Sequence, residues 1–308
     1  MTYTFKTLQR DGGKQAAILS RSMIPFLRKS SFANKNEFLY NSLRQSGYIE
    51  SIEKIERCNE RSSCLSIYCS KCRIRFIKKL YKNIVERIAK ADIDDNTVRE
   101  RMRFCSNLDA LIPAEESSVL NALREIKDGY TRFGWSQEGT WARGVVEIEL
   151  LDMRNLDRFY WLEDKKQRKR DVIIDMGGNK RDWAWKDKIG ENRFDYVLIH
   201  SYFFLDRGIN DWCDIENAMK RQWRGMFRYE IQEINKNKRI EKYIADVISN
   251  FNKDRTHHCY DLGNLTIDER MGELYQLSNT EMSCLFNIYQ NIIENDNGGL
   301  ILSWDIEK

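Results

Sequence analysis

Proline is scarce in this chain, with two residues in 308, so long proline-rich linkers are not expected. No stretch approaches the ~20 consecutive apolar residues that a transmembrane helix needs. The opening segment MTYTFKTLQRDGG lacks the apolar core of a signal peptide. From these absences we expect a cytoplasmic protein with no membrane partner. Thiols are reduced in that compartment, so clustered cysteines are interpreted as metal ligands before disulfides.

A strong overall charge is also missing, because 51 basic and 47 acidic residues leave a net charge of only +4. That balance does not by itself indicate nucleic-acid binding. Lysine and arginine nevertheless cluster at 73–82, 165–170 and 236–239, with aromatic residues nearby. Such runs fit a phosphate-binding surface and equally a solvated face, and both interpretations stay open. With 12% aromatic and 42% hydrophobic residues, the chain is expected to fold.

Four of the eight cysteines lie close together, in the segment CNERSSCLSIYCSKC. They are Cys58, Cys64, Cys69 and Cys72, and the last two have a C-x-x-C spacing that lets two thiolates share one tetrahedral Zn²⁺. Structural zinc is the leading interpretation, and four unpaired thiols or a redox pair are the alternatives. We expect the other cysteines to pack as small apolar residues: Cys105, Cys213, Cys259 and Cys284.

A basic amphipathic helix is predicted directly after this cluster. Its apolar residues recur at three- and four-residue spacing: Ile74, Ile77, Tyr81, Ile84 and Ile88. The remaining positions are rich in basic residues: Arg73, Arg75, Lys78, Lys79 and Lys82. The helix is therefore expected to pack on a core. Its basic side either contacts DNA phosphates or is simply solvated.

The rest of the chain alternates between strand and helix patterns, which predicts an α+β fold. Strands are expected at 101–112, 139–153, 171–178, 196–208 and 228–234, and at the final LILSW. Helices are expected after Pro113, at 211–227, at 239–254 and around 266–294. We divide the chain into an N-terminal helical region with the cysteine cluster (1–95), an α+β core (96–256) and a helical tail (257–308).

Four segments in this order carry a likeness to a known family: CLSIYCSKCR, RGVVEIELLD, YVLIHSYFFLDRG and the stretch 219–253. Through them the chain resembles the replication initiators of rolling-circle plasmids. These initiators belong to the tyrosine endonucleases that carry a histidine–hydrophobic–histidine (HUH) motif. The resemblance implies an antiparallel sheet with flanking helices, an HUH-nuclease-like core, preceded by a zinc-binding helical segment.

In that family a helix-borne tyrosine attacks a DNA phosphodiester and becomes linked to the 5′ phosphate. A divalent cation, held by two histidines of one strand and a polar residue of its neighbour, polarises the phosphate. By this resemblance Tyr243 matches the nucleophile and His200 the second histidine, while Leu198 stands in place of the first. Glu147 or Glu149 matches the neighbouring ligand, and a site with one histidine suits Mg²⁺ or Mn²⁺.

These residues also have structural interpretations. Tyr243 lies in the apolar stripe of its helix, which favours a buried core tyrosine over a nucleophile. His200 is either a metal ligand or a core histidine, and Asp246 stands where the family often has a lysine. Tyr202, Tyr229 and Tyr260 are lesser candidates for the nucleophile. We interpret the adjacent His257 and His258 as part of a loop.

The leading hypothesis is a DNA-binding protein that resembles a replication initiator with weakened or lost nicking activity, acting in plasmid or mobile-element replication or its control. The expected partner is single-stranded or hairpin, origin-like DNA, and the tail is assigned to homo-oligomer formation or a helicase contact. DNA contacts are expected from the basic helix and from Arg168, Lys169 and Arg170. Two rival hypotheses are an active metal-dependent nickase that forms a covalent phosphotyrosine, and a zinc-stabilised interaction module without nucleic-acid binding.

Overall fold

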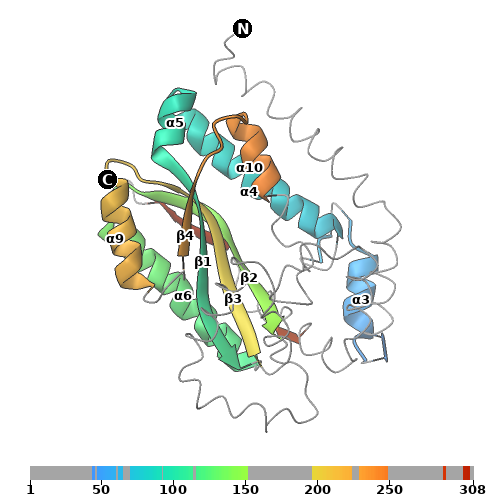
Figure 1. Ribbon diagram of the computed structural model, residues 1–308. Coiled ribbons are helices and arrows are strands. Elements are labelled where there is room, and N and C mark those ends of the chain that lie inside the picture. The colour runs from blue at the N-terminus through green and yellow to red at the C-terminus, as the bar shows by residue number, and fades with distance from the viewer. Residues whose placement is uncertain are drawn as a thin grey trace, which may run out of the picture.

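A computed structural model describes ten stretches of the chain, which together contain the whole sheet and its covering helices (Figure 1). These stretches are residues 44–45, 47–59, 62–64, 70–91, 93–113, 116–151, 196–223, 229–248, 287–288 and 301–305. Within them, no helix is long and apolar enough to cross a membrane.

A five-stranded antiparallel sheet forms the centre of the fold, with the strand order β4-β1-β3-β2-β5. The strands are β1 (Met102–Pro113), β2 (Trp141–Leu151), β3 (Tyr196–Asp206), β4 (Tyr229–Glu233) and β5 (Ile301–Asp305). The three long strands β1, β3 and β2 lie side by side, and the two short strands form the edges. The predicted α+β fold with an antiparallel sheet is therefore confirmed.

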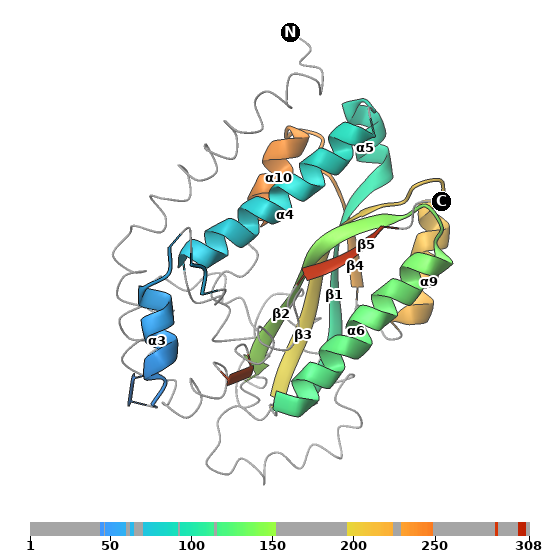
Figure 2. The same cartoon turned by 180° about the vertical axis from the view of Figure 1, so that it is seen from behind.

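Helices cover both faces of this sheet (Figures 1 and 2). One face carries α6 (Glu116–Ser136) and α9 (Trp212–Gln222), and the other carries α4 (Ser70–Lys90) and α10 (Ile240–Ile248). A short helix, α5 (Asp95–Arg101), leads into β1, and α3 (Ile49–Glu56) packs its Ile55 against the cysteine cluster. The flanking helices expected from the sequence are present.

The central strand β3 serves two separate cores because successive side chains point to opposite faces. Residues such as Val197, Ile199 and Phe203 belong to the core under α6 and α9. Phe204 and Tyr202 belong to the core under α4 and α10. By the same alternation, Leu198 and His200 point to the sheet face that carries α4 and α10, and both are buried.

Helix α4 has the amphipathic character that the sequence predicts. Tyr81, Ile84 and Ile88 are buried in the core that it shares with α10, whereas Lys78, Lys79 and Lys82 are exposed. Burial of this apolar stripe fixes the helix on the sheet and leaves its basic side facing water.

Several element boundaries differ from the sequence prediction. The helix expected directly after Pro113 begins at Glu116, because β1 continues through Pro113, which lies opposite Tyr196. The helix expected at 211–227 ends at Gln222. The strands expected at 139–153 and 228–234 are confirmed as β2 and β4, and LILSW contributes β5. The strand expected at 171–178 and most of the helix expected around 266–294 lie outside the described residues.

Candidate functional site

His200 and Glu147 are direct neighbours across two central strands. His200 lies on β3, Glu147 lies on β2, and the antiparallel register pairs them with each other. Both are buried, with exposed fractions of 2% and 5%. Directly opposed residues of an antiparallel pair hold their Cβ atoms roughly 5 Å apart. An imidazole and a carboxylate at that separation can serve one cation, as the resemblance implies for this strand pair.

The next register pair on this face lacks such chemistry. Leu198 is paired with Glu149, and the leucine is fully buried. A leucine side chain has no atom that can bind a metal ion, so this position adds no ligand beside His200. The side chain of Glu149 lies outside the described residues, and its predicted role as a ligand stays a prediction.

Tyr243, the predicted nucleophile, packs further along the same face. Its ring lies edge-on to Phe204, with 6.3 Å between the ring centres. Four residues of extended strand separate Phe204 from His200, which corresponds to roughly 13 Å. Burial raises the pKa of Tyr243. A phenol that keeps its proton is a weaker nucleophile than one prepared for deprotonation.

A different tyrosine lies beside His200. The rings of Tyr202 and His200 are nearly parallel, with an interplanar angle of 9° and 6.0 Å between their centres. Phe104 on β1 continues the row, with its ring stacked on Tyr202 at 6.4 Å. Tyr202 is half-buried, and the sequence pattern favours it less than Tyr243 as a nucleophile. Tyr229 lies on the edge strand β4, and Tyr260 is outside the described residues.

Three of the four clustered cysteines come together between α3 and α4. The Sγ atom of Cys72 lies 3.4 Å from that of Cys58 and 3.6 Å from that of Cys64. A zinc ion with Zn–S bonds of about 2.3 Å would hold its thiolates roughly 3.8 Å apart. The three residues could therefore bind a metal ion, whose identity the geometry leaves open. Cys69 lies outside the described residues.

The loop that carries these cysteines is tied to α4. Arg75 donates a hydrogen bond of 2.6 Å to the carbonyl of Asn59, and Asn59 in turn accepts one from the backbone N–H of Ser62. Arg75, which the sequence offered as a DNA contact, is therefore engaged in holding this loop. Lys82, another predicted DNA contact, forms an ion pair of 3.6 Å with Glu86. The side chains of the remaining predicted contacts Arg73, Arg168, Lys169 and Arg170 lie outside the described part of the chain.

The isolated cysteines behave in two ways. Cys105 is fully buried in β1, and burial strongly raises the pKa of its thiol, so its expected role as a small apolar residue is confirmed. Cys213 is exposed near the start of α9, so the same expectation was wrong for it. Isolated cysteines give no sequence signal that separates a buried position from one near the end of a surface helix. Cys259, Cys284 and the His257–His258 pair lie outside the described residues.

A buried polar cluster on the opposite sheet face is not predicted by the sequence pattern. Asp109 accepts hydrogen bonds from Tyr130 Oη at 2.9 Å, from Trp223 Nε1 at 3.0 Å and from Ser201 Oγ. Asn107 Nδ2 donates to Tyr130 Oη at 2.6 Å. Desolvation raises the pKa of Tyr130 well above its usual value. The only sequence signal was one carboxylate within the apolar run LDALI.

Comparison with models of protein families, with curated proteins and with solved structures found no match for this chain. The candidate sites are therefore identified from the side chains of the described residues alone. One sheet face carries His200 beside Glu147, three cysteines form a cluster suited to a metal ion, and α4 presents lysines to water.

Proposed function

We propose that the chain is a DNA-binding protein with a core like that of rolling-circle replication initiators, whose nicking activity is weakened or lost. The observation that carries this proposal is the pairing of His200 with Glu147 on the face covered by α10, with Leu198 beside them. Those positions correspond to the metal-binding positions of such initiators, and one of the two histidines is replaced by an apolar residue. The DNA is single-stranded or forms an origin-like hairpin on a plasmid or mobile element.

Three features of β2, β3 and α10 support the loss of nicking. His200 and Glu147 supply fewer ligands than the two histidines and a polar neighbour of an initiator, so Mg²⁺ or Mn²⁺ binds weakly. Tyr243 packs on Phe204 and has a raised pKa. Asp246 lies one turn after Tyr243 and forms an ion pair of 3.0 Å with Lys238. An aspartate at this position repels a phosphate, where the initiators often have a lysine.

DNA affinity is assigned to the exposed side of α4. Lys78, Lys79 and Lys82 lie within two turns of the helix and are all exposed. Burial of the opposite stripe, with Tyr81 and Ile84, fixes their position relative to the sheet. Contacts of this kind release counterions from DNA, so binding must weaken as salt rises.

The cysteine cluster is assigned to a structural zinc ion, with Cys69 as the fourth ligand beside Cys58, Cys64 and Cys72. The sulfur separations support this assignment, because they are close to those of a tetrahedral thiolate site. Zinc would join the end of α3 to the start of α4 and so hold the basic helix in place.

The zinc assignment is tested by elemental analysis of protein purified without added metal. We expect about one zinc ion per chain in the wild type and in Cys213→Ser, whose cysteine lies outside the cluster. Cys72→Ser should lose the metal and lower the midpoint of thermal unfolding. A wild-type protein without zinc would contradict the assignment.

DNA binding is tested with fluorescent single-stranded and hairpin oligonucleotides at increasing salt. We expect the variant with Lys78→Gln, Lys79→Gln and Lys82→Gln to bind more weakly and with a shallower salt dependence, by about one unit of slope for each phosphate that is no longer neutralised. Lys220→Gln, an exposed lysine on α9, is the matched control. Wild-type protein that fails to bind at low salt would contradict the proposal and favour the zinc-stabilised interaction module.

A further inference from the structure

A pocket of about 480 Å³ opens at the end of the sheet where β1 begins and α9 starts. It is lined by Glu100, Arg103, Arg207, Asp211, Trp212 and Cys213. The volume lies in the range of small-molecule sites. None of these residues belongs to the His200 face, to the cysteine cluster or to the basic side of α4.

An indole held in a fixed orientation forms one wall. Trp212 Nε1 donates a hydrogen bond of 2.8 Å to the carbonyl of Glu100. The guanidinium carbon of Arg103 lies 4.9 Å from the centre of the Trp212 ring, in a cation–π arrangement. Arg103 is itself held by an ion pair of 3.2 Å with Glu233 on β4. The guanidinium lies over one face of the ring, so a planar aromatic ligand has the other ring face or the guanidinium plane to stack on.

A second arginine supplies positive charge at the opening. The backbone N–H of Arg207 donates to the carbonyl of Arg101 at 3.0 Å, and its Nη1 donates to the carbonyl of Asn210. Within the part of the chain that the structure describes, its guanidinium forms no ion pair with a carboxylate. The remaining N–H donors of Arg207 are thus available to an anionic ligand.

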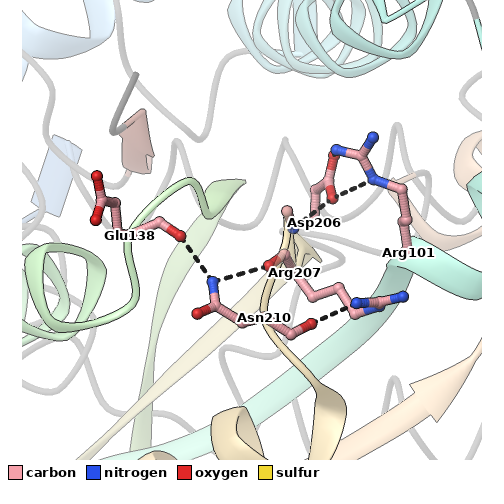
Figure 3. A network of polar contacts seen from close by, with 6 residues as sticks. Arg101, Glu138, Asp206, Arg207 and Asn210 are labelled. Carbon is pink, nitrogen blue, oxygen red and sulfur yellow. Dashed lines mark hydrogen bonds and ion pairs between the residues drawn. The ribbon is translucent and has the colours of Figure 1, made fainter. Parts of the chain in front are cut away.

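The loop that presents Arg207 is held in place by hydrogen bonds to neighbouring elements (Figure 3). Arg101 pairs with Asp206 through two hydrogen bonds of 3.1 and 2.9 Å, and Asp206 accepts a third from the N–H of Gly208. Asn210 donates to the carbonyl of Glu138 at 2.7 Å, which ties this loop to the turn before β2. A braced loop loses little conformational entropy when a ligand binds.

The mixed charge of the pocket narrows the class of ligand. Asp211 and Glu100 are both exposed at the rim, so a purely anionic ligand such as free phosphate would meet repulsion as well as attraction. A nucleotide combines the matching groups, because its phosphate is anionic while the amino groups of its base donate to carboxylates. Its base also offers a flat ring to Trp212.

We propose that this pocket binds one unpaired nucleotide of a single-stranded DNA. The base packs against Trp212, the phosphate is bound by Arg207, and Asp211 or Glu100 accepts a hydrogen bond from the amino group of the base. This inference rests on the proposed DNA-binding function and adds a subsite remote from α4. The only base donor that thymine offers a carboxylate is its N3–H, which lies between two carbonyl oxygens that repel the carboxylate. The pocket therefore favours bases with an exocyclic amino group over thymine.

The test compares full-length variants on fluorescent oligo-dC and oligo-dT of equal length. The wild type should bind oligo-dC more tightly than oligo-dT. Arg207→Gln should weaken binding to both, by about five- to tenfold, whereas Arg207→Lys keeps the charge and should lose less. Asp211→Asn should reduce the preference for oligo-dC, because the amide can also donate a hydrogen bond to thymine. Asp211 is exposed and makes no side-chain cap bond to α9, so this variant should fold normally.

Cys213 gives an independent readout because it is exposed and lines the pocket. Its alkylation by a maleimide, followed by peptide mass spectrometry, should slow when oligo-dC is bound and not in Arg207→Gln at the same concentration. Lys220→Gln on α9 is the control and should behave like the wild type in both assays.

The outcomes separate this inference from the broader proposal. Wild-type binding that is unchanged by Arg207→Gln and leaves Cys213 equally reactive would overturn the pocket while DNA binding through α4 stands. Binding with no preference between oligo-dC and oligo-dT in the wild type would overturn the role of the carboxylates. Wild-type protein that binds neither oligonucleotide would overturn both proposals together.

Discussion

Leu198 and His200 point to the same face of β3, and only the histidine can bind a metal ion. Glu147 lies directly opposite His200 and offers a carboxylate, so one imidazole and one carboxylate are paired on this face. In an initiator the two histidines would lie two positions apart and point to the same face of the strand. In our proposal, the leucine at this one position is what weakens the divalent-metal site.

The buried polar cluster around Asp109 predicts that one carboxylate contributes strongly to the stability of the fold. Its carboxylate accepts hydrogen bonds from Tyr130, Trp223 and Ser201, all within the core. Asp109→Ala would leave these three donors buried without an acceptor, at a cost of roughly 3–5 kcal/mol in the free energy of unfolding. Denaturant unfolding measures this cost. Asp128→Ala, at an exposed position of α6, is the control and should change stability by less than about 0.5 kcal/mol. A loss below about 1 kcal/mol for Asp109→Ala would contradict a tightly coupled cluster.

Alternation along β2 predicted that Glu147 lies on the opposite strand face from its apolar neighbours. It could not predict that Glu147 is paired with His200. That pairing depends on the register between β2 and β3, which links residues about fifty positions apart in sequence. The Asp109 cluster could not be predicted from the sequence for the same reason. The cluster needs β1, α6, β3 and the end of α9 together, and β1 has a register shift between Leu108 and Ala110 beside Asp109.

At the scale of elements, the contact between α4 and α10 predicts a response to alkaline pH. Burial of Tyr81, with the nearby carboxylate of Glu241, raises the pKa of its phenol to about 12. The unfolded chain ionises this tyrosine near pH 10. Between pH 10 and pH 12 the unfolded state therefore binds fewer protons than the folded state, and stability falls as pH rises. The contribution of Tyr81 is roughly 2–3 kcal/mol at most.

Urea unfolding at several pH values tests this response. The free energy of unfolding of the wild type should begin to decrease near pH 8.5, where the unfolded chain ionises Cys105, and should decrease more steeply above pH 10, where it ionises Tyr81. Tyr81→Phe should show a shallower decrease, because the ring stays in the core and the ionising group is gone. An equal slope in both proteins would show that Tyr81 is not buried against α10.

The packing of β2 against β3 gives a third prediction. A Cβ atom at Gly144 would clash with the carbonyl of Tyr202 and with the backbone and Cβ of Phe203, so no side chain fits there. Gly144→Ala should destabilise the protein by several kcal/mol or prevent folding, as measured by thermal unfolding and yield of soluble protein. Gly129→Ala is the matched control, because it lies within α6 and meets only the flexible end of Gln222. That variant should be neutral or gain up to about 1 kcal/mol. Equal stability of both variants would contradict the close approach of the strands.

At the scale of the whole molecule, local sequence patterns predicted the class of fold but could not predict its topology. Apolar residues at helical spacing correctly predicted α4, and alternation correctly predicted β2. The strand order β4-β1-β3-β2-β5 arises from pairings between distant segments, such as β2 with β5, and no local pattern encodes them. For the same reason the sequence could not show that Tyr243 packs beside Phe204 while Tyr202 stacks on His200.

The central claim is a molecule that binds DNA but does not nick it efficiently. The most direct measurement incubates the full chain with labelled single-stranded oligonucleotide libraries and Mn²⁺, and scores both retained DNA and adducts that survive denaturing electrophoresis. We predict retention that decreases as salt rises, with no covalent adduct. A Mn²⁺-dependent adduct that Tyr243→Phe or Tyr202→Phe abolishes would contradict the account and establish an active nickase.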